Sequence, residues 1–285
     1  GLQVFVIKSF CPWCFTTHLI GLLTAGAIFW KGRAPFKVLF AIIPLVLMAL
    51  LILGQIYGPK PKTYVFTSDA ALEKREGGNA HNEGKGRLVA FKDTTGRVVK
   101  TYRLGSVPLI GSPDAKHFLV KYFDYTCQSC RAMEEDLSVL MQTYPGEVAA
   151  IVLPTPLNRE CNPYLDTNIH DHEHACELAR LGLAVWRAQP ESFEAAHEIL
   201  FQRPPHSGVS ARAELQEIIG VEKLEAALKD PWIGNVLKSN LEDYHALSSQ
   251  KIEMPKLMIK GNKTMHGLSS STEQFLKIIT KEFQL

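Results

Sequence analysis

Two apolar runs limit what the first 57 residues can form. Residues 12–30 carry only His18 and the Cys14 thiol as ionisable groups, and residues 38–57 carry no charged side chain. Each run has about the length that a helix needs to cross a hydrocarbon core of ~30 Å. We therefore expect two transmembrane helices, at about 12–30 and 38–57, although a pair of buried core helices is the alternative.

The hairpin formed by these two helices would return the chain to the side from which it started. Lys and Arg are nearly balanced around the hairpin, so the positive-inside rule does not orient it. All six cysteines fall into three sequence-local pairs, which is typical of an oxidising compartment. We therefore expect a plasma- or inner-membrane protein whose CPWC end and soluble part both face the oxidising, extracytoplasmic side, with lipid around the hairpin.

Two of the cysteine pairs have Cys-x-x-Cys spacing, Cys11-Pro-Trp-Cys14 and Cys127-Gln-Ser-Cys130. Such a pair can open and close a disulfide within one helical turn and so hold two electrons. One pair lies at the start of an apolar run and the other in a polar region, which suggests electron transfer between protein thiols and a membrane-soluble carrier. The net charge of +2 gives no indication of a nucleic-acid partner.

The polar part of the chain begins with a linker and a β-hairpin, at residues 58–104. Residues 105–285 then read as an α/β domain in which a strand over 117–125 leads to Cys127 and a helix covers 133–144. A second strand is expected at 148–153 and a helical insertion at about 175–248. A strand at 256–260, a turn, a short strand and a helix from Ser271 complete the expected order.

The N-terminal stretch from Ser9 to His18, entering an apolar run, resembles the last core helix of the vitamin K epoxide reductase family. The resemblance implies a helical bundle that passes electrons from thiols to a quinone. It implies that Cys14 lies beside the quinone, that Cys11 exchanges with a shuttle pair, and that His18 contacts the quinone; His18 could equally be a polar contact without a role. The family's first three helices and its shuttle cysteine pair do not appear in these 285 residues, so we expect a fragment or a processed product that does not by itself couple thiol exchange to quinone reduction.

The soluble domain resembles the DsbA-like branch of the thioredoxin superfamily, in its segment from Lys121 to Cys130, its Met254-Pro255 dipeptide and its helical insertion. The resemblance implies that Cys127 attacks, Cys130 resolves and Pro255 is the cis-proline that faces them. Gln128 stands where many relatives have Pro, which leaves the redox poise undecided. The expected fold is thus an α-helical membrane hairpin followed by an α/β thioredoxin-like domain with a helical insertion.

Cys161 and Cys176 lie 15 residues apart, in a polar loop and at a helix start. We expect a structural disulfide that contributes roughly 3 kcal/mol. The alternative is a metal site that also uses the histidines of the segment His170–His174; we favour no metal. Half a zinc site remains the alternative for Cys127 and Cys130. Asp124 is either a proton-transfer partner of the thiol pair or an ordinary polar residue.

These features predict a membrane-tethered thiol–disulfide oxidoreductase. It would form disulfides in secreted or periplasmic clients at Cys127 and Cys130 and pass electrons through Cys11 and Cys14 to a quinone. The alternatives are a disulfide reductase or isomerase, and a non-catalytic metal-binding or assembly module.

Overall fold

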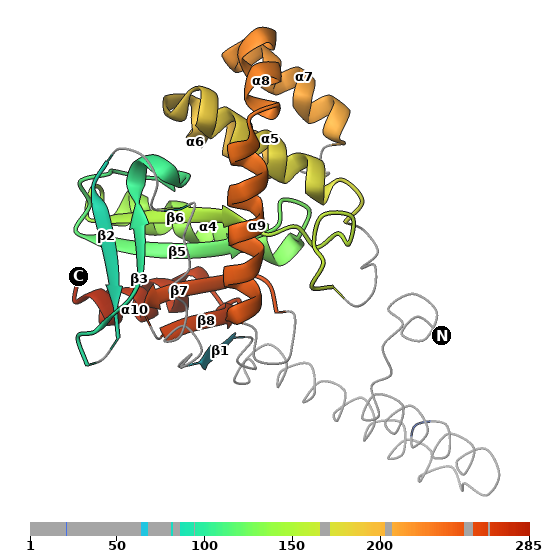
Figure 1. Cartoon of the computed structure of the whole chain (residues 1–285). Helices are drawn as coiled ribbons and strands as arrows, with labels where there is room; N and C mark the ends of the chain where they lie inside the picture. Colours follow the sequence, from blue (N-terminus) through green and yellow to red (C-terminus); the bar gives the residue numbers. More distant parts are fainter. Residues whose placement is uncertain are drawn as a thin grey trace, which may run out of the picture. The chain divides into compact units, whose positions relative to one another are not determined.

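The computed structural model divides the chain into two units, Gly1–Pro61 and Lys62–Leu285, and the second carries the fold described below (Figure 1). The structure describes Gly21, strand β1, His81 and residues 86–93, 95–165, 172–202, 207–247, 253–261 and 263–285. Both predicted membrane segments, 12–30 and 38–57, lie outside these ranges apart from Gly21. Within the ranges, no helix has the length and apolar character needed to cross a membrane.

The second unit is built around a six-stranded sheet with the order β1-β8-β7-β5-β6-β4. The central strands β5 and β6 run parallel, and all other neighbours are antiparallel. The strand bounds are β1 Tyr64–Thr67, β4 Leu109–Ile110, β5 His117–Phe123, β6 Val148–Pro154, β7 Lys256–Lys260 and β8 Lys263–Gly267. The four longer strands are the predicted ones, whereas β1 and β4 were not predicted.

Helices cover the sheet and extend beyond it (Figure 1). On one face α4 (Gln128–Thr143) packs against α10 (Thr272–Phe283), and α9 (Pro231–Ala246) crosses the opposite face. The rest of the predicted helical insertion comprises α5 Ala175–Ala188, α6 Phe193–Leu200, α7 Gly208–Ile219 and α8 Val221–Leu228. Two short 3₁₀ helices, η3 and η4, span Leu104–Ser106 and Pro190–Ser192. Asp230 and Ser271 cap the first turns of α9 and α10 with their side-chain oxygens.

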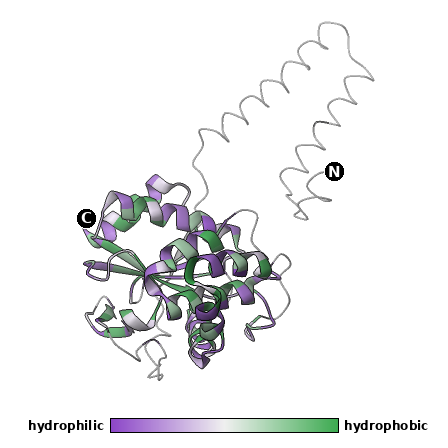
Figure 2. Cartoon of the chain, turned by 90° about the horizontal axis from the view of Figure 1, so that it is seen from above, coloured by the Kyte–Doolittle hydropathy of each residue, from purple (hydrophilic) through white to green (hydrophobic). Residues whose placement is uncertain are grey.

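Alternation along β5 creates two cores, one on each face of the sheet. Leu119 and Phe123 join the core beneath α4 and the insertion, whereas Val120 and Tyr122 join a second core. In Figure 2 the strands are mostly hydrophobic in colour, while the helices show both hydrophobic and hydrophilic positions. The second core is closed by the predicted β-hairpin, in which β2 (Leu88–Lys92) pairs with β3 (Val98–Arg103).

His81, in the predicted linker, is buried against this second face. Its Nε2 lies 2.8 Å from Asn240 Oδ1, and its Nδ1 lies 3.4 Å from Asp243 Oδ2. Lys100 of β3 donates to the other oxygen of Asp243 at 2.6 Å. His81 is therefore held against α9, at the same aspartate that binds Lys100 of the hairpin. The polar sequence around His81 did not predict this contact.

Candidate active site

The Cys127–Cys130 pair sits where β5 passes into α4. The strand ends at Phe123, a short turn follows, and Cys127 is the N-cap of the helix, with extended backbone angles (φ −78°, ψ 119°). The Cys127 N–H donates to the Asp124 carbonyl at 3.1 Å, and the Cys127 carbonyl accepts the N–H of Arg131 at 3.1 Å. The sulfur of Cys127 thus lies at a helix N-terminus, where backbone N–H groups and the helix dipole favour a thiolate.

The two thiols differ in both access and acidity. Neither cysteine forms a disulfide in this structure. Cys127 is 8% exposed and Cys130 is fully buried, so of the two only Cys127 has contact with solvent. The hydrogen bond from the Cys130 thiol lowers the pKa of Cys127, and the backbone N–H groups of Cys130 and Ser129 add to this against the effect of burial. Burial raises the pKa of Cys130 well above its ordinary value. The pair is therefore arranged as one nucleophile and one protonated partner.

Pro255 immediately precedes β7, and its peptide bond with Met254 is cis. In the antiparallel pairing of β5 with β7, Tyr122 lies opposite Lys256. Pro255 is one residue before Lys256, so it lies beside the end of β5 that leads to Cys127. The Pro255 carbonyl accepts the N–H of Gly267, which ties this loop to β8. The predicted cis-proline thus lies at the same sheet end as the thiol pair.

Asp124 opens the turn before Cys127 and is 2% exposed. Its Oδ1 accepts the N–H and the hydroxyl of Thr126, at 2.6 and 2.5 Å, and its Oδ2 accepts the Leu157 N–H at 2.5 Å. The Asp124 N–H points to the Cys130 sulfur at 3.5 Å. Burial raises the pKa of the Asp124 carboxyl, and these hydrogen bonds and His172 oppose the shift. Asp124 is therefore built into the turn rather than an incidental polar residue.

A second polar cluster lies beneath Cys130, on the face of β5 that carries Leu119 and Phe123. Lys121 is fully buried and forms an ion pair with Glu134 of α4, whose carboxylate also lies 3.3 Å from His197 Nε2. His197 Nδ1 bonds the Tyr125 hydroxyl at 2.8 Å. Burial tends to raise the pKa of Glu134, but Lys121 and His197 outweigh it and hold that pKa well below its usual range.

The positive charge of Lys121 also acts on the thiol pair. It lowers the pKa of Cys130 in opposition to the larger effect of burial. The sequence analysis did not identify this cluster as part of the site. Lys121 could have indicated the cluster, because it interrupts an otherwise apolar strand. A buried lysine needs an acidic or hydrogen-bonding partner in the fold.

Cys161 and Cys176 form a disulfide, as the sequence analysis expected. The carbonyl oxygen of Asn158 lies 3.8 Å from each of the two sulfurs. Of the histidines considered as metal ligands, His170 lies outside the described residues and His172 contacts Thr126. In the part of the chain that the structure describes, no three His, Cys, Asp or Glu side chains are grouped to hold a metal ion.

The other predicted site residues cannot be placed. Cys11, Cys14 and His18, the expected quinone-proximal groups, lie outside the described residues. Their roles therefore rest on the resemblance of the N-terminal stretch alone.

A dithiol at the N-terminus of a helix, entered from a central strand and flanked by a cis-proline, defines a thioredoxin-like domain. The chain belongs to the thioredoxin family, whose model, described as Thioredoxin, matches residues 104–281. The predicted thioredoxin-like fold with a helical insertion is thereby confirmed. The match does not extend to residues 1–57, so the resemblance to the vitamin K epoxide reductase family stays a prediction.

Solved structures of ScsC from Proteus mirabilis are similar to this chain. ScsC in a transitional conformation is 25% identical, with a TM-score of 0.50, over 62% of this chain and 72% of that one. A linker-deletion variant is 24% identical, with a TM-score of 0.51, over 63% and 75% of the two chains. The catalytic domain of ScsC is 23% identical, with a TM-score of 0.50, over 63% and 90%. No curated protein matches the chain.

Proposed function

We propose that this protein is a thiol–disulfide oxidoreductase whose reactive pair is Cys127 and Cys130. The observation that carries the proposal is the asymmetry of the pair: Cys127 keeps 8% of its surface exposed, caps a helix and has a lowered pKa, whereas Cys130 is fully buried and its pKa is raised. A purely structural pair would need neither the difference in burial nor the stabilised thiolate.

The proposed exchange runs through a mixed disulfide at Cys127. A client thiolate attacks the Cys127 sulfur of the oxidised pair, and Cys130 leaves and takes up a proton. The client's second thiolate then attacks its own sulfur in the mixed disulfide, and Cys127 leaves as a thiolate. The client loses two electrons and the protein pair gains them.

The stabilised Cys127 thiolate favours this oxidising direction. A thiol of lower pKa is the better leaving group, and stabilising the reduced form makes the pair a stronger oxidant. The clients in this proposal are secreted or periplasmic proteins with pairs of thiols. Pro255, beside the end of β5, would present backbone to an extended client segment.

The proposal includes membrane tethering and a quinone as the final electron acceptor. Residues 12–30 and 38–57 would anchor the domain on the oxidising side of a plasma or inner membrane. The reduced Cys127–Cys130 pair would be reoxidised through Cys11 and Cys14, with Cys14 and His18 next to the quinone. The support is the length of the apolar runs and the resemblance of the first 30 residues.

Oxidation of a synthetic dithiol peptide tests the exchange itself. The full chain, preoxidised and mixed with excess reduced peptide, should yield one peptide disulfide per Cys127–Cys130 pair. Cys127→Ser should abolish the reaction, and a Cys161→Ser/Cys176→Ser variant should retain it. Unchanged peptide oxidation by Cys127→Ser would exclude the proposed site.

A second experiment addresses the membrane link. In membranes of cells that express the chain together with the missing helices and shuttle cysteines, in cis or as a partner chain, Cys14→Ser should leave Cys127 and Cys130 predominantly reduced, because the pair can still accept electrons but cannot pass them on. The redox state is read by alkylating free thiols in acid-quenched samples. A Cys127–Cys130 pair that stays as oxidised as in the parent protein would contradict the quinone pathway.

A further inference from the structure

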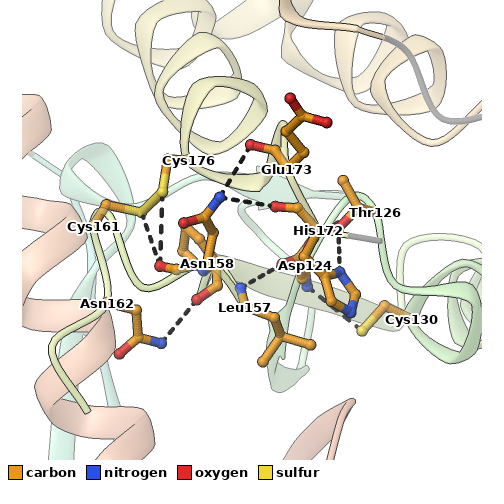
Figure 3. A network of polar contacts seen from close by, with 11 residues as sticks. Asp124, Thr126, Cys130, Leu157, Asn158, Cys161, Asn162, His172, Glu173 and Cys176 are labelled. Carbon is orange, nitrogen blue, oxygen red and sulfur yellow. Dashed lines mark hydrogen bonds and ion pairs between the residues drawn. A yellow bond between two sulfur atoms is a disulfide. The ribbon is translucent and has the colours of Figure 1, made fainter. Parts of the chain in front are cut away.

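The turn before Cys127 is contacted by a residue that the proposed exchange does not use. His172 precedes α5, and its Nδ1 lies 2.5 Å from the Thr126 hydroxyl and 3.9 Å from Asp124 Oδ2. Figure 3 shows the imidazole reaching toward these two residues, close to Cys130. The side chain of His172 is 13% exposed. A titratable group in contact with solvent is therefore linked to a buried carboxylate beside the thiol pair.

The hydrogen bonds among these residues run in one direction. An ionised carboxylate only accepts, so the single hydroxyl hydrogen of Thr126 is donated to Asp124 Oδ1. The Thr126 oxygen then accepts from His172, which must carry a hydrogen on Nδ1. The chain of donors thus leads from His172 through Thr126 to Asp124, and each member supports the negative charge of the carboxylate.

This carboxylate acts on the reactive sulfur. The hydrogen bond from Cys130 is the main reason for the lowered pKa of Cys127, and the charge of Asp124 opposes it. Burial raises the pKa of Asp124, while Thr126, Leu157 and the charge of His172 lower it. Lys121 is a further charged group that acts on the pair, through Cys130. His172 is therefore the partner that reaches Asp124 from the solvent side of the turn.

The loop around His172 is held in place. The Asn158 side-chain amide donates to the carbonyls of His172 and Glu173, at 3.1 Å each. The Asn158 carbonyl in turn lies against both sulfurs of the Cys161–Cys176 disulfide (Figure 3). The imidazole is thus presented to Thr126 by a loop that a disulfide closes, rather than by a mobile surface position.

We propose that His172 is a positioning residue for thiol exchange at Cys127, acting through Thr126 on the Asp124 carboxylate. The inference rests on the proposed function. His172 and Thr126 hold the Asp124 carboxylate in its ionised form, and its negative charge raises the pKa of Cys127, so the thiolate forms less readily than beside a protonated Asp124.

The test is the pH dependence of alkylation of Cys127 in the reduced full chain. Modification by iodoacetamide is followed by mass spectrometry of the peptide that contains Cys127. His172→Gln should lower the midpoint of the alkylation profile by about half a unit, which is about a threefold gain of thiolate on the acid side, because a less stabilised Asp124 carboxylate opposes the thiolate less. Thr126→Val should reproduce the shift, and Thr126→Ser, which keeps the hydroxyl, should not. His174→Gln, two residues away, is the matched control.

A double-mutant comparison separates this role from a merely structural one. In an Asp124→Asn background, His172→Gln should no longer move the midpoint, because the carboxylate through which it acts is gone. An unchanged or raised midpoint in His172→Gln, or an equal shift in both backgrounds, would overturn the proposal. Alkylation needs no client, so a chain that shows these shifts but oxidises no dithiol peptide would reject only the proposed function.

Discussion

At the scale of single residues, the two reactive cysteines are distinguished by their surroundings and not by their spacing. The sequence predicted that Cys127 and Cys130 form a pair and which of them attacks, because a strand-to-helix junction is visible in the pattern. It could not predict Glu134 and His197 beneath them. These residues come from α4 and α6, and only the tertiary fold brings them to Lys121.

His197 should make the domain less stable in mild acid. Burial lowers the pKa of His197, against the opposing charge of Glu134. Below about pH 6.5 the unfolded chain therefore binds a proton at this site that the folded chain does not, so the free energy of unfolding falls as pH decreases from 6.5 toward the folded-state pKa. The pKa of Glu134 is also low, so its carboxyl adds a further loss only below about pH 4.

Urea unfolding between pH 7.5 and 5, followed by tryptophan fluorescence, measures this dependence. Trp186 is a suitable reporter because its ring packs edge-on against Phe193, one turn before His197. The difference in free energy between the parent protein and His197→Gln should shrink as pH falls, since only the parent has the titrating imidazole. A difference that stays constant across this range would show that His197 does not titrate on unfolding.

At the scale of elements, the sequence predicted those that are long and periodic. β5, β6 and β7 are apolar runs, and α10 follows a serine that caps it. β1 and β4 span four and two residues, too short for alternation to be recognised, and both are edge strands defined by their partners β8 and β6. The disulfide at the start of α5 was predictable because Cys161 and Cys176 are 15 residues apart and the other four cysteines already form two Cys-x-x-Cys pairs.

The Cys161–Cys176 disulfide should be structural and resistant to reduction. We expect that mild reductant opens Cys127–Cys130 first, because the Cys127 sulfur is the one that keeps some contact with solvent and, in the second step of reduction, Cys127 leaves as a stabilised thiolate. Replacing Cys161 and Cys176 together by Ser should lower the free energy of unfolding by about 3 kcal/mol, through loss of the loop constraint on the unfolded chain. Peptide mapping after graded reduction checks the order; early opening of Cys161–Cys176 would contradict it.

At the scale of the whole molecule, the two units differ in the observations that support their assignment. The unit Lys62–Leu285 has the family match, the sheet and the site; the unit Gly1–Pro61 has apolar length and a motif. Within the second unit, His81 of the predicted linker is buried against α9. The polar, glycine-rich sequence around it did not predict this anchor, because its partners Asn240 and Asp243 lie about 160 residues away.

Trapping of mixed disulfides tests whether Cys127 is the thiol that exchanges with clients. In cells that express the full chain, Cys130→Ser should accumulate client proteins bound to Cys127 through reducible disulfides, because the resolving thiol is gone and the attacked sulfur remains accessible. Cys127→Ser should trap none, since the remaining Cys130 sulfur is fully buried. Non-reducing electrophoresis with mass spectrometry of the linked peptides provides the measurement. Equal trapping by the two variants, or trapping by Cys127→Ser alone, would contradict the assignment of Cys127 as the exchanging thiol.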